Sequence, residues 1–287
     1  MCFINSFGII GGDKRQLYCA KSIADDGCNV FLSGFDKSEN LMGLQNTDTE
    51  FLAQHCEALI LPLPVTTDGI NINTPLSDKK IRINEDFIRL FDNKPIFCGM
   101  KNKLKSCYEL FRNTQLYDYS ERDEFAVENA VPTSEGAIEI AMHEYDGTVN
   151  GARCLVTGYG RIGRVLSDML TGIGAKVCVS ARKQKDLAFI RAKGMQAMPT
   201  SKLVGNYDII FNTVPYLVFD AHTLARIATG ALVIDLASLP GGVDFNAAKR
   251  MSIKAIHALS IPGKSAPKAA GIIIKNAVYN IIEEEGL

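Results

Sequence analysis

The chain has 287 residues, of which 47% are hydrophobic and 22% are charged, and its formal net charge at pH 7 is −1. This length allows two domains of ordinary size, and the composition is typical of a globular protein. The near-neutral charge gives no support for a nucleic-acid partner or an anionic membrane surface, and no apolar run approaches the ~20 residues that span a bilayer.

The predicted elements begin with a strand at 7–10, a Gly-Gly-Asp turn at 11–13 and a helix over 14–25. Because no cationic segment precedes it, we interpret the N-terminus as this strand and not as a signal peptide. Residues 121–145 have helical character, which Pro132 interrupts. The other strands predicted in this half lie at 29–33, 58–64, 94–99 and 115–118, and the prolines of 58–64 indicate a strand that runs into a loop.

The second half repeats this alternation, which is typical of α/β folds with parallel sheets. We predict two doubly wound Rossmann-like domains with a cleft between them, where ligands of such folds collect at the strand ends. Residues 1–130 would form the domain on the substrate and partner side, and residues 131–287 the NADP-binding domain, with a C-terminal helix over 266–284 packing back across the boundary. Strands of the second domain are expected at 153–157, 176–180, 207–211, 231–235 and 254–257.

A glycine turn of the form G-x-G-x-x-G follows the strand over 153–157 and opens a helix. Its first glycine permits the tight turn, its second lets the backbone approach a pyrophosphate, and its third lets the helix pack on the sheet. The amides at the helix start would then face the phosphates. The cofactor-binding residues predicted here are Gly158, Tyr159, Gly160, Arg161, Ile162 and Gly163.

The end of the next strand predicts which dinucleotide binds. An NAD site usually places a carboxylate there for the ribose hydroxyls. This chain has Ser180, with Arg182 and Lys183 just beyond. A hydroxyl and two cations suit the 2′-phosphate of NADP, which a carboxylate would repel, so we predict NADP.

Three more segments follow predicted strands, and each is small, polar or glycine-containing. Because the carboxyl ends of parallel strands meet at one rim, we expect these segments, including a loop over 260–264, to line the ribose and nicotinamide half of the cofactor. Taken singly, each could equally be a plain turn. The predicted cofactor-binding residues are Asn212, Thr213, Val214, Pro215, Asp235, Leu236, Ala237 and Pro262, with Ser238 facing the substrate.

An anionic substrate group has two predicted binding places. Arg15 opens the first helix, where backbone amides and a cation meet, although Asp13 could simply cap that helix and leave Arg15 solvated. The second place is the start of the helix that leads into the second domain, where Thr133 and Ser134 carry hydroxyls.

Candidates for proton transfer are Glu135, His257 and Lys264, and residue types alone leave the choice between them open. No metal site is predicted, because the four histidines show no metal-ligand spacing. The eight cysteines include no C-x-x-C pair, which favours a reducing cytosol over a disulfide framework.

Several phrases together resemble the dipicolinate synthase family of spore-forming bacteria, specifically its A-subunit. The similarity spans essentially the whole chain in the same order. Two positions depart from the family pattern, namely Ala269 in place of threonine and Lys264 in place of an apolar residue. The resembling phrases are Gly11–Asp13 with Arg15 and Gln16, Glu121–Asp123, Pro132 and Thr133 with Glu135 and Gly136, Gly158–Gly163, Asn212 and Thr213 with Pro215, Asp235–Gly242 with Asp244 and Phe245, and Pro262 and Gly263 with Ala266 and Pro267.

The resemblance implies a sporulation enzyme in the cytoplasm of the mother cell. It would oxidise a small dicarboxylate, a dihydrodipicolinate or 4-hydroxy-tetrahydrodipicolinate precursor, to pyridine-2,6-dicarboxylate with NADP. It also implies a partner, the flavoprotein-like B-subunit of dipicolinate synthase, and we expect the chain to form a homo-oligomer as well.

Two alternatives stay open at this point. Another NAD(P)-dependent dehydrogenase of the hydroxyacid or alanine dehydrogenase type would need an acid–base histidine with a carboxylate partner, and no such pair is evident. A non-catalytic NADP-sensing module would need only the dinucleotide site.

Overall fold

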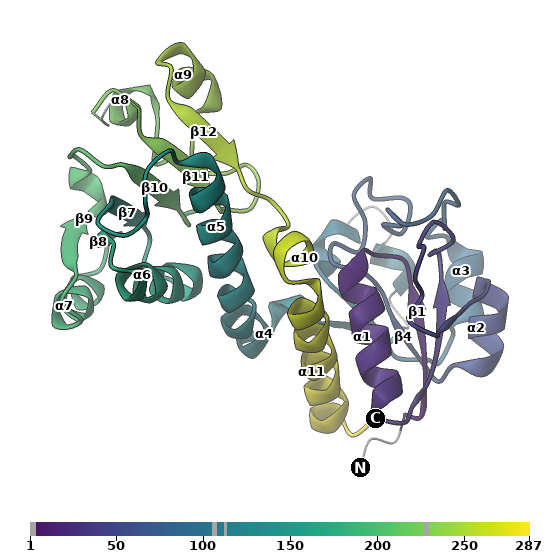
Figure 1. Ribbon diagram of the computed structural model, residues 1–287. Helices are drawn as coiled ribbons and strands as arrows, with labels where there is room; N and C mark the ends of the chain where they lie inside the picture. The colour runs from purple at the N-terminus through teal and green to yellow at the C-terminus, as the bar shows by residue number, and fades with distance from the viewer. Residues whose placement is uncertain (1–3, 105–107, 112–113, 227–229) are drawn as a thin grey trace. The chain divides into compact units, whose positions relative to one another are not determined.

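The computed structural model describes residues 4–104, 108–111, 114–226 and 230–287 (Figure 1). The chain divides into two compact units, one made of residues 1–129 with 266–287 and the other of residues 130–265. Each unit contains one six-stranded sheet whose strands are all parallel. The predicted α/β class with two doubly wound sheets is therefore confirmed. The roles assigned to the two halves, and the cleft expected between them, stay predictions.

The first unit has the strand order β3-β2-β1-β4-β5-β6. Its central strand β1 is buried along its whole length, as expected of a parallel strand covered on both faces. The strands are β1 (Ser6–Ile10), β2 (Asn29–Ser33), β3 (Gln45–Asn46), β4 (Ala58–Ile60), β5 (Ile96–Cys98) and β6 (Leu116–Asp118). The helices are α1 (Lys14–Asp25), α2 (Thr49–His55), α3 (Glu85–Leu90), α4 (Asp123–Glu128) and α11 (Pro267–Glu285), with 3₁₀ turns at Lys101–Leu104, Tyr108–Phe111 and Tyr119–Glu121.

The last helix of the chain completes the first unit by packing along its first helix. Figure 1 shows α11 running beside α1, and the apolar side chains of Ile274 and Val278 are buried in the same core as Leu17 and Ile23. The two helices lie close together at Gly271, where an added Cβ would lie 2.5 Å from the carbonyl oxygen of Arg15. Glycine is therefore required at this crossing.

The second unit has the order β12-β11-β10-β7-β8-β9, so β7 is central and lies between β8 and β10. This is the strand order of a dinucleotide-binding fold, with its switch point between β7 and β10. The strands are β7 (Arg153–Thr157), β8 (Lys176–Ala181), β9 (Gln196–Pro199), β10 (Ile209–Asn212), β11 (Leu232–Asp235) and β12 (Lys254–His257). The helices are α5 (Ala130–Glu144), α6 (Arg161–Ile173), α7 (Gln184–Ala192), α8 (Ala221–Leu224), α9 (Phe245–Arg250) and α10 (Ile261–Ser265), with a 3₁₀ turn at Thr200–Lys202.

Two local features differ from the predictions. The edge strands β3 and β9 were not predicted, because their half-exposed side chains give no apolar run. The strand predicted to run into a loop over 58–64 ends at Ile60, since Pro62 and Pro64 carry no N–H for a ladder. The loop predicted over 260–264 is largely helical, because α10 begins at Ile261 and Pro262 is tolerated in a first turn.

Pro132 interrupts the helical segment predicted over 121–145, although the break between the two helices lies three residues before the proline. The helix α4 ends at Glu128 and α5 begins at Ala130, so Pro132 lies inside the first turn of α5. A helical proline removes the hydrogen bond to the carbonyl four residues earlier, which here belongs to Glu128. The predicted interruption is thus present.

Cysteines in this fold serve as small apolar side chains. Cys19, Cys98 and Cys178 are buried without a disulfide, and burial raises the pKa of the Cys56 thiol to about 11 and that of Cys154 to about 12. These thiols are protonated and unreactive at neutral pH. Within the described ranges, no helix is long and apolar enough to cross a membrane, and no three His, Cys, Asp or Glu side chains gather as metal ligands.

The close packing of α11 on α1 predicts that a Gly→Ala change destabilises the protein at Gly271 but not at an open helix position. Gly271→Ala should lower the free energy of unfolding by about 1–3 kcal/mol, because the new methyl meets helix backbone. Gly172→Ala is the matched control on α6, where an added Cβ meets nothing within 4 Å, so it should be neutral or raise stability by up to about 1 kcal/mol. Urea unfolding followed by circular dichroism checks both, and equal stabilities would contradict the close crossing.

Candidate dinucleotide site

The glycine turn after β7 has a separate steric reason at each glycine. Gly158 has φ +94°, which favours glycine. At Gly163 an added Cβ would lie 2.1 Å from the carbonyl oxygen of Gly158, so only glycine lets α6 fold back onto the turn. Gly160 caps α6, and an added Cβ there meets nothing within 4 Å. The space above Gly160 is therefore open, as a bound pyrophosphate would require.

A cavity of about 470 Å³ opens over this turn. Its walls come mainly from the ends of β7, β8 and β10 and the segments that follow them, and these strands are neighbours in the sheet, while Thr200 follows β9. Cations outnumber carboxylates along it, since Asp186 is its only carboxylate among the described residues and pairs with Arg164 at 3.5 Å. The lining residues are Gly158, Tyr159, Gly160, Arg164, Ala181, Arg182, Lys183, Lys185, Asp186, Thr200, Thr213, Val214, Pro215 and Tyr216.

Ser180, predicted to contact the cofactor, is fully buried and does not line this cavity. The strand β8 continues to Ala181, one residue further than expected, so Arg182 follows the strand end. The hydroxyl of Thr200 lies beside that of Ser180, to which it donates at 3.4 Å, and Thr200 does line the cavity.

A buried polar network holds the rim on the other side of the turn. Asn212 and Asp235 end β10 and β11 and are completely buried. Asn212 Nδ2 donates to Asp235 Oδ1 at 2.7 Å, while Thr157 Oγ1 donates to Asn212 Oδ1 at 2.8 Å. The Asp235 carboxylate also accepts from the amides of Ala237 and Gly242. All these groups are satisfied within the protein, so the network positions the rim.

Beside this network, Thr213 also fixes the turn, because its hydroxyl donates to the carbonyl oxygen of Thr157 at 2.8 Å. Leu236 and Ala237 are buried just after β11, whereas Ser238 is exposed. Pro262 is buried in α10 and is not among the residues that line the cavity.

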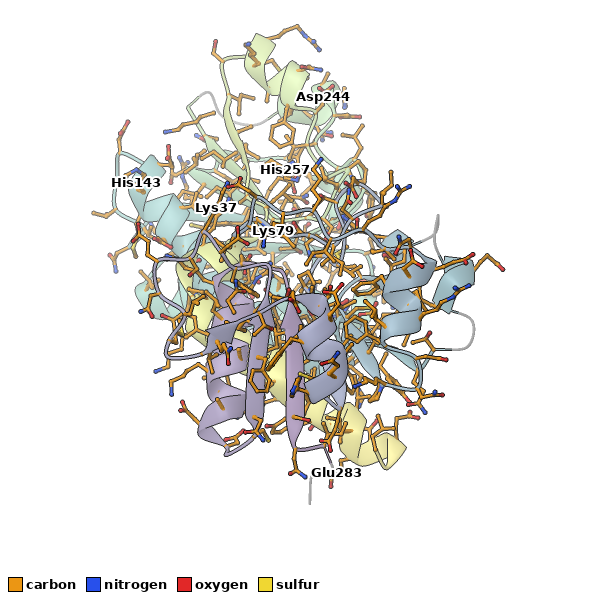
Figure 2. All side chains as sticks on the ribbon, turned by 90° about the vertical axis from the view of Figure 1, so that its right-hand side faces the viewer. Lys37, Lys79, His143, Asp244, His257 and Glu283 are labelled. Carbon is orange, nitrogen blue, oxygen red and sulfur yellow. The ribbon has the colours of Figure 1, made fainter. Side chains whose placement is uncertain are left out.

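His257 (labelled in Figure 2) ends β12 at the same rim as Asp235, its register partner. Its Nε2 lies 3.2 Å from the carbonyl oxygen of Ala237, and its ring stacks on Phe245 with centroids 5.3 Å apart. The hydrogen bond of its ring is thus to a backbone carbonyl and not to a carboxylate. Alternation along β12 places Ile256 in the core that contains α5, so His257 faces the opposite side of the sheet.

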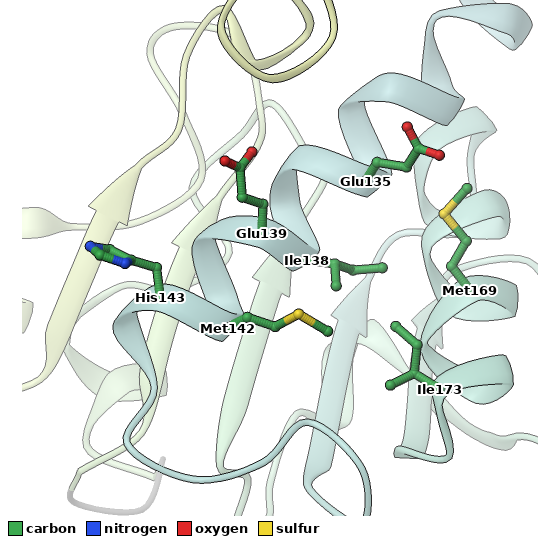
Figure 3. Close-up of a pocket in the computed structure, with 7 residues that line it drawn as sticks. All are labelled: Glu135, Ile138, Glu139, Met142, His143, Met169 and Ile173. Carbon is green, nitrogen blue, oxygen red and sulfur yellow. The ribbon is translucent and has the colours of Figure 1, made fainter.

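The three proton-transfer candidates are therefore not brought together. Glu135 lies on α5 beside a groove of about 710 Å³, opposite Met169 and Ile173 of α6 (Figure 3). His257 faces α9, on the other face of the sheet. Lys264 is exposed on the short helix α10.

The predicted substrate-binding side chains are largely engaged within the protein. Arg15 forms a fork with the Asp13 carboxylate, with Nε and Nη2 each 2.9 Å from an oxygen, and Nη2 also donates to the carbonyl of Leu63 at 2.6 Å. Ser134 Oγ donates to the carbonyl of Ala130 inside α5 at 2.7 Å, and its side chain is fully buried. Thr133 is also buried, which leaves Ser238 as the exposed member of this set.

Six cavity residues escaped the sequence prediction: Arg164, Ala181, Lys185, Asp186, Thr200 and Tyr216. A helical spacing of three from Arg161 could have pointed to Arg164. Tyr216 and Thr200 come from segments whose convergence on the turn depends on strand order, which no local pattern carries.

Comparisons with known proteins agree with this geometry. Residues 6–120 match the family described as the N-terminal domain of the dipicolinate synthase A-subunit. Residues 125–238 match the family described as D-isomer specific 2-hydroxyacid dehydrogenase, NAD binding domain. The second match includes the glycine turn and the rim that follows β10 and β11.

Full-length relatives carry the same similarity. The dipicolinate synthase A-subunit of Bacillus subtilis is 32% identical over 285 residues, which are 96% of this chain and 95% of that protein. The crystal structure of the dipicolinate synthase A-subunit from Bacillus halodurans has a TM-score of 0.87 at 32% identity and covers 97% of both chains. An L-alanine dehydrogenase structure with 13% identity, a TM-score of 0.62 and coverage of 98% of this chain and 90% of its own shares the fold alone.

The turn geometry predicts that substitutions at two of its glycines have different effects, one on ligand binding and the other on stability. Gly160→Ala should leave the melting temperature nearly unchanged but weaken binding of a nicotinamide dinucleotide about tenfold or more, because the methyl fills the open space over α6. Gly163→Ala should destabilise the unit itself, since its methyl meets the Gly158 carbonyl. Thermal unfolding and titration calorimetry separate the two, and unaltered binding by the Gly160 variant would contradict this placement of the phosphates.

Proposed function

The chain belongs to the family of dipicolinate synthase A-subunits, and from that premise we propose that it is an NADP-dependent dehydrogenase that forms pyridine-2,6-dicarboxylate. Its second unit is a nicotinamide-dinucleotide-binding domain of the dehydrogenase type. The name of its relatives gives the product. The substrate would be a dihydrodipicolinate, which loses one hydride and one proton, or 4-hydroxy-tetrahydrodipicolinate, which must also lose one water. The observation that carries the proposal is the cationic cavity over the glycine turn, in a chain related to this family over its whole length.

The choice of NADP rests on charge. Arg182 and Lys183 follow β8, where an NAD site would carry a carboxylate, and Lys185 lines the same cavity. The cavity's carboxylate, Asp186, faces the guanidinium of Arg164. A 2′-phosphate would gain charge-assisted hydrogen bonds from these cations.

The residues around the turn fit a dinucleotide, and different groups among them would bind its phosphates and position the rim. Amides at the start of α6 would bind the pyrophosphate above Gly160. The Asn212–Asp235 pair would hold the rim beside the nicotinamide without touching it, because both side chains are buried. When bound, NADP⁺ supplies the hydride acceptor that turns the ring of the substrate aromatic.

Substrate contacts are assigned by exposure. Ser238 is exposed just after β11 and is proposed to contact the dicarboxylate. Arg15 in the first unit is a second candidate for a substrate contact, although the Asp13 carboxylate already balances its charge. Thr133 is a third candidate. We assign Ser134 no contact, because its hydroxyl is bonded inside α5.

For the proton that the substrate loses, His257 is the proposed acceptor. It lies at the carboxyl rim of the sheet, and when Nε2–H donates to the Ala237 carbonyl, Nδ1 keeps a lone pair. Glu135 is less suited, because it lines the α5–α6 groove instead of the rim.

The proposal extends to assembly and place of action. Because its relatives are named as one subunit of dipicolinate synthase, a second protein is expected, and we propose that this partner is the flavoprotein-like B-subunit. We further propose that the chain self-associates and acts in the cytoplasm of the mother cell during sporulation.

A coupled assay tests the reaction. Purified chain, with and without the B-subunit, receives 4-hydroxy-tetrahydrodipicolinate made in situ together with NADP⁺ or NAD⁺, and NADPH and pyridine absorbance are followed. We expect pyridine formation with a preference for NADP⁺, and the double change Arg182→Ala with Lys183→Ala should reduce that preference about 10- to 100-fold. Dinucleotide binding with no turnover under either condition would favour an NADP-sensing module instead.

The role of His257 has its own test. His257→Gln keeps a donor toward the Ala237 carbonyl but cannot accept the proton, so turnover should fall about 10²-fold or more while the dissociation constant for NADP⁺ stays unchanged. Glu135→Gln is the matched control and should leave turnover near that of the parent chain. Full activity of the His257 variant would assign the proton to another group.

A further inference from the structure

Arg182 and Tyr216 meet across the mouth of the dinucleotide cavity. The central carbon of the Arg182 guanidinium lies 5.4 Å from the centroid of the Tyr216 ring. Both residues line the cavity and both are exposed, Tyr216 to 42%. The contact is therefore accessible to a ligand that enters the cavity.

Strand order explains why these two residues meet. Arg182 follows β8 and Tyr216 follows β10, and these strands flank β7 on either side. Segments that leave neighbouring parallel strands at their carboxyl ends approach one another over the strand between them. The pair thus spans the glycine turn that ends β7.

The ring leaves the guanidinium free to bind an anion. A stacked aromatic ring covers one face of a guanidinium, while its N–H donors point outward in the plane. Within the described residues no carboxylate pairs with Arg182, whereas Arg164 in the same cavity faces Asp186. Arg182 therefore keeps its charge and its donors for a ligand, in a position that the ring restricts.

We propose that Tyr216 is a positioning residue for dinucleotide selection. Its ring holds the Arg182 guanidinium over the turn, so that the donor edge meets the 2′-phosphate of the adenosine ribose. Tyr216 acts through Arg182 and does not itself bind the phosphate. The inference rests on the proposed use of NADP.

Two adenosine nucleotides test it without any need for turnover. The full chain is titrated calorimetrically with 2′,5′-ADP, which carries the ribose phosphate, and with 5′-AMP, which lacks it. The parent chain should prefer 2′,5′-ADP, and Tyr216→Ala should reduce that preference about two- to fivefold. Tyr216→Phe should retain it, because a phenyl ring stacks on a guanidinium as well. Leu217→Ala, at an adjacent position that is 58% exposed and outside the cavity lining, is the matched control.

The dependence on Arg182 supplies the decisive comparison. In an Arg182→Ala background the preference should already be low, and adding Tyr216→Ala should change it no further. Equal weakening of both nucleotides by Tyr216→Ala would mean that the ring packs on adenine, which overturns the positioning role. An unchanged preference would overturn it as well, and would leave the NADP proposal intact. A parent chain without any preference for 2′,5′-ADP would remove the NADP proposal together with the inference.

Discussion

The carboxylate of Asp235 is fully buried, and its two oxygens accept hydrogen bonds from Asn212 Nδ2, Ala237 N and Gly242 N. A buried carboxylate is costly unless such bonds satisfy it, so the segments that supply the donors are held in one arrangement. The same network extends through Asn212 to Thr157, the last residue before the glycine turn. The ends of β7, β10 and β11 are thereby fixed relative to one another, and the shape of the cofactor rim follows from that constraint.

The glycine turn depends on this fixed rim as well as on its own backbone. Thr213 crowds Gly158, since an added Cβ there would lie 2.5 Å from its hydroxyl oxygen, and the same hydroxyl bonds to the Thr157 carbonyl. The turn therefore has no room to shift toward β10. On its open side lie the cations that follow β8. The cavity thus has one rigid, internally bonded wall and one charged wall that remains available to a ligand.

Much of this could be predicted from sequence because the signals are local. Apolar runs predicted β7, β8, β11 and β12 within about a residue, and the glycine spacing predicted the turn together with α6. The features that the sequence did not predict depend on contacts between segments that are distant along the chain. Ser180 is fully buried in β8, which continues to Ala181, and Tyr216 lines the cavity because of the strand order. Asp235 was predicted to contact the cofactor, but no local pattern shows that its oxygens are already bonded within the protein.

The two units have the same strand order, yet their first strand-to-helix turns differ in whether the helix start is open to a phosphate. In the first unit the Asp13 and Gln16 side chains cap α1 reciprocally, and an added Cβ at Gly12 would lie 2.4 Å from Gln16 Oε1. The helix start is thus already filled by side chains of the chain itself. In the second unit α6 has no side-chain cap, and the space over Gly160 is open. A helix N-terminus binds an external anion only where its amides are left without an internal acceptor. Capping by a side chain, and not the fold itself, therefore separates the helix start that is open to a phosphate from the one that closes on itself.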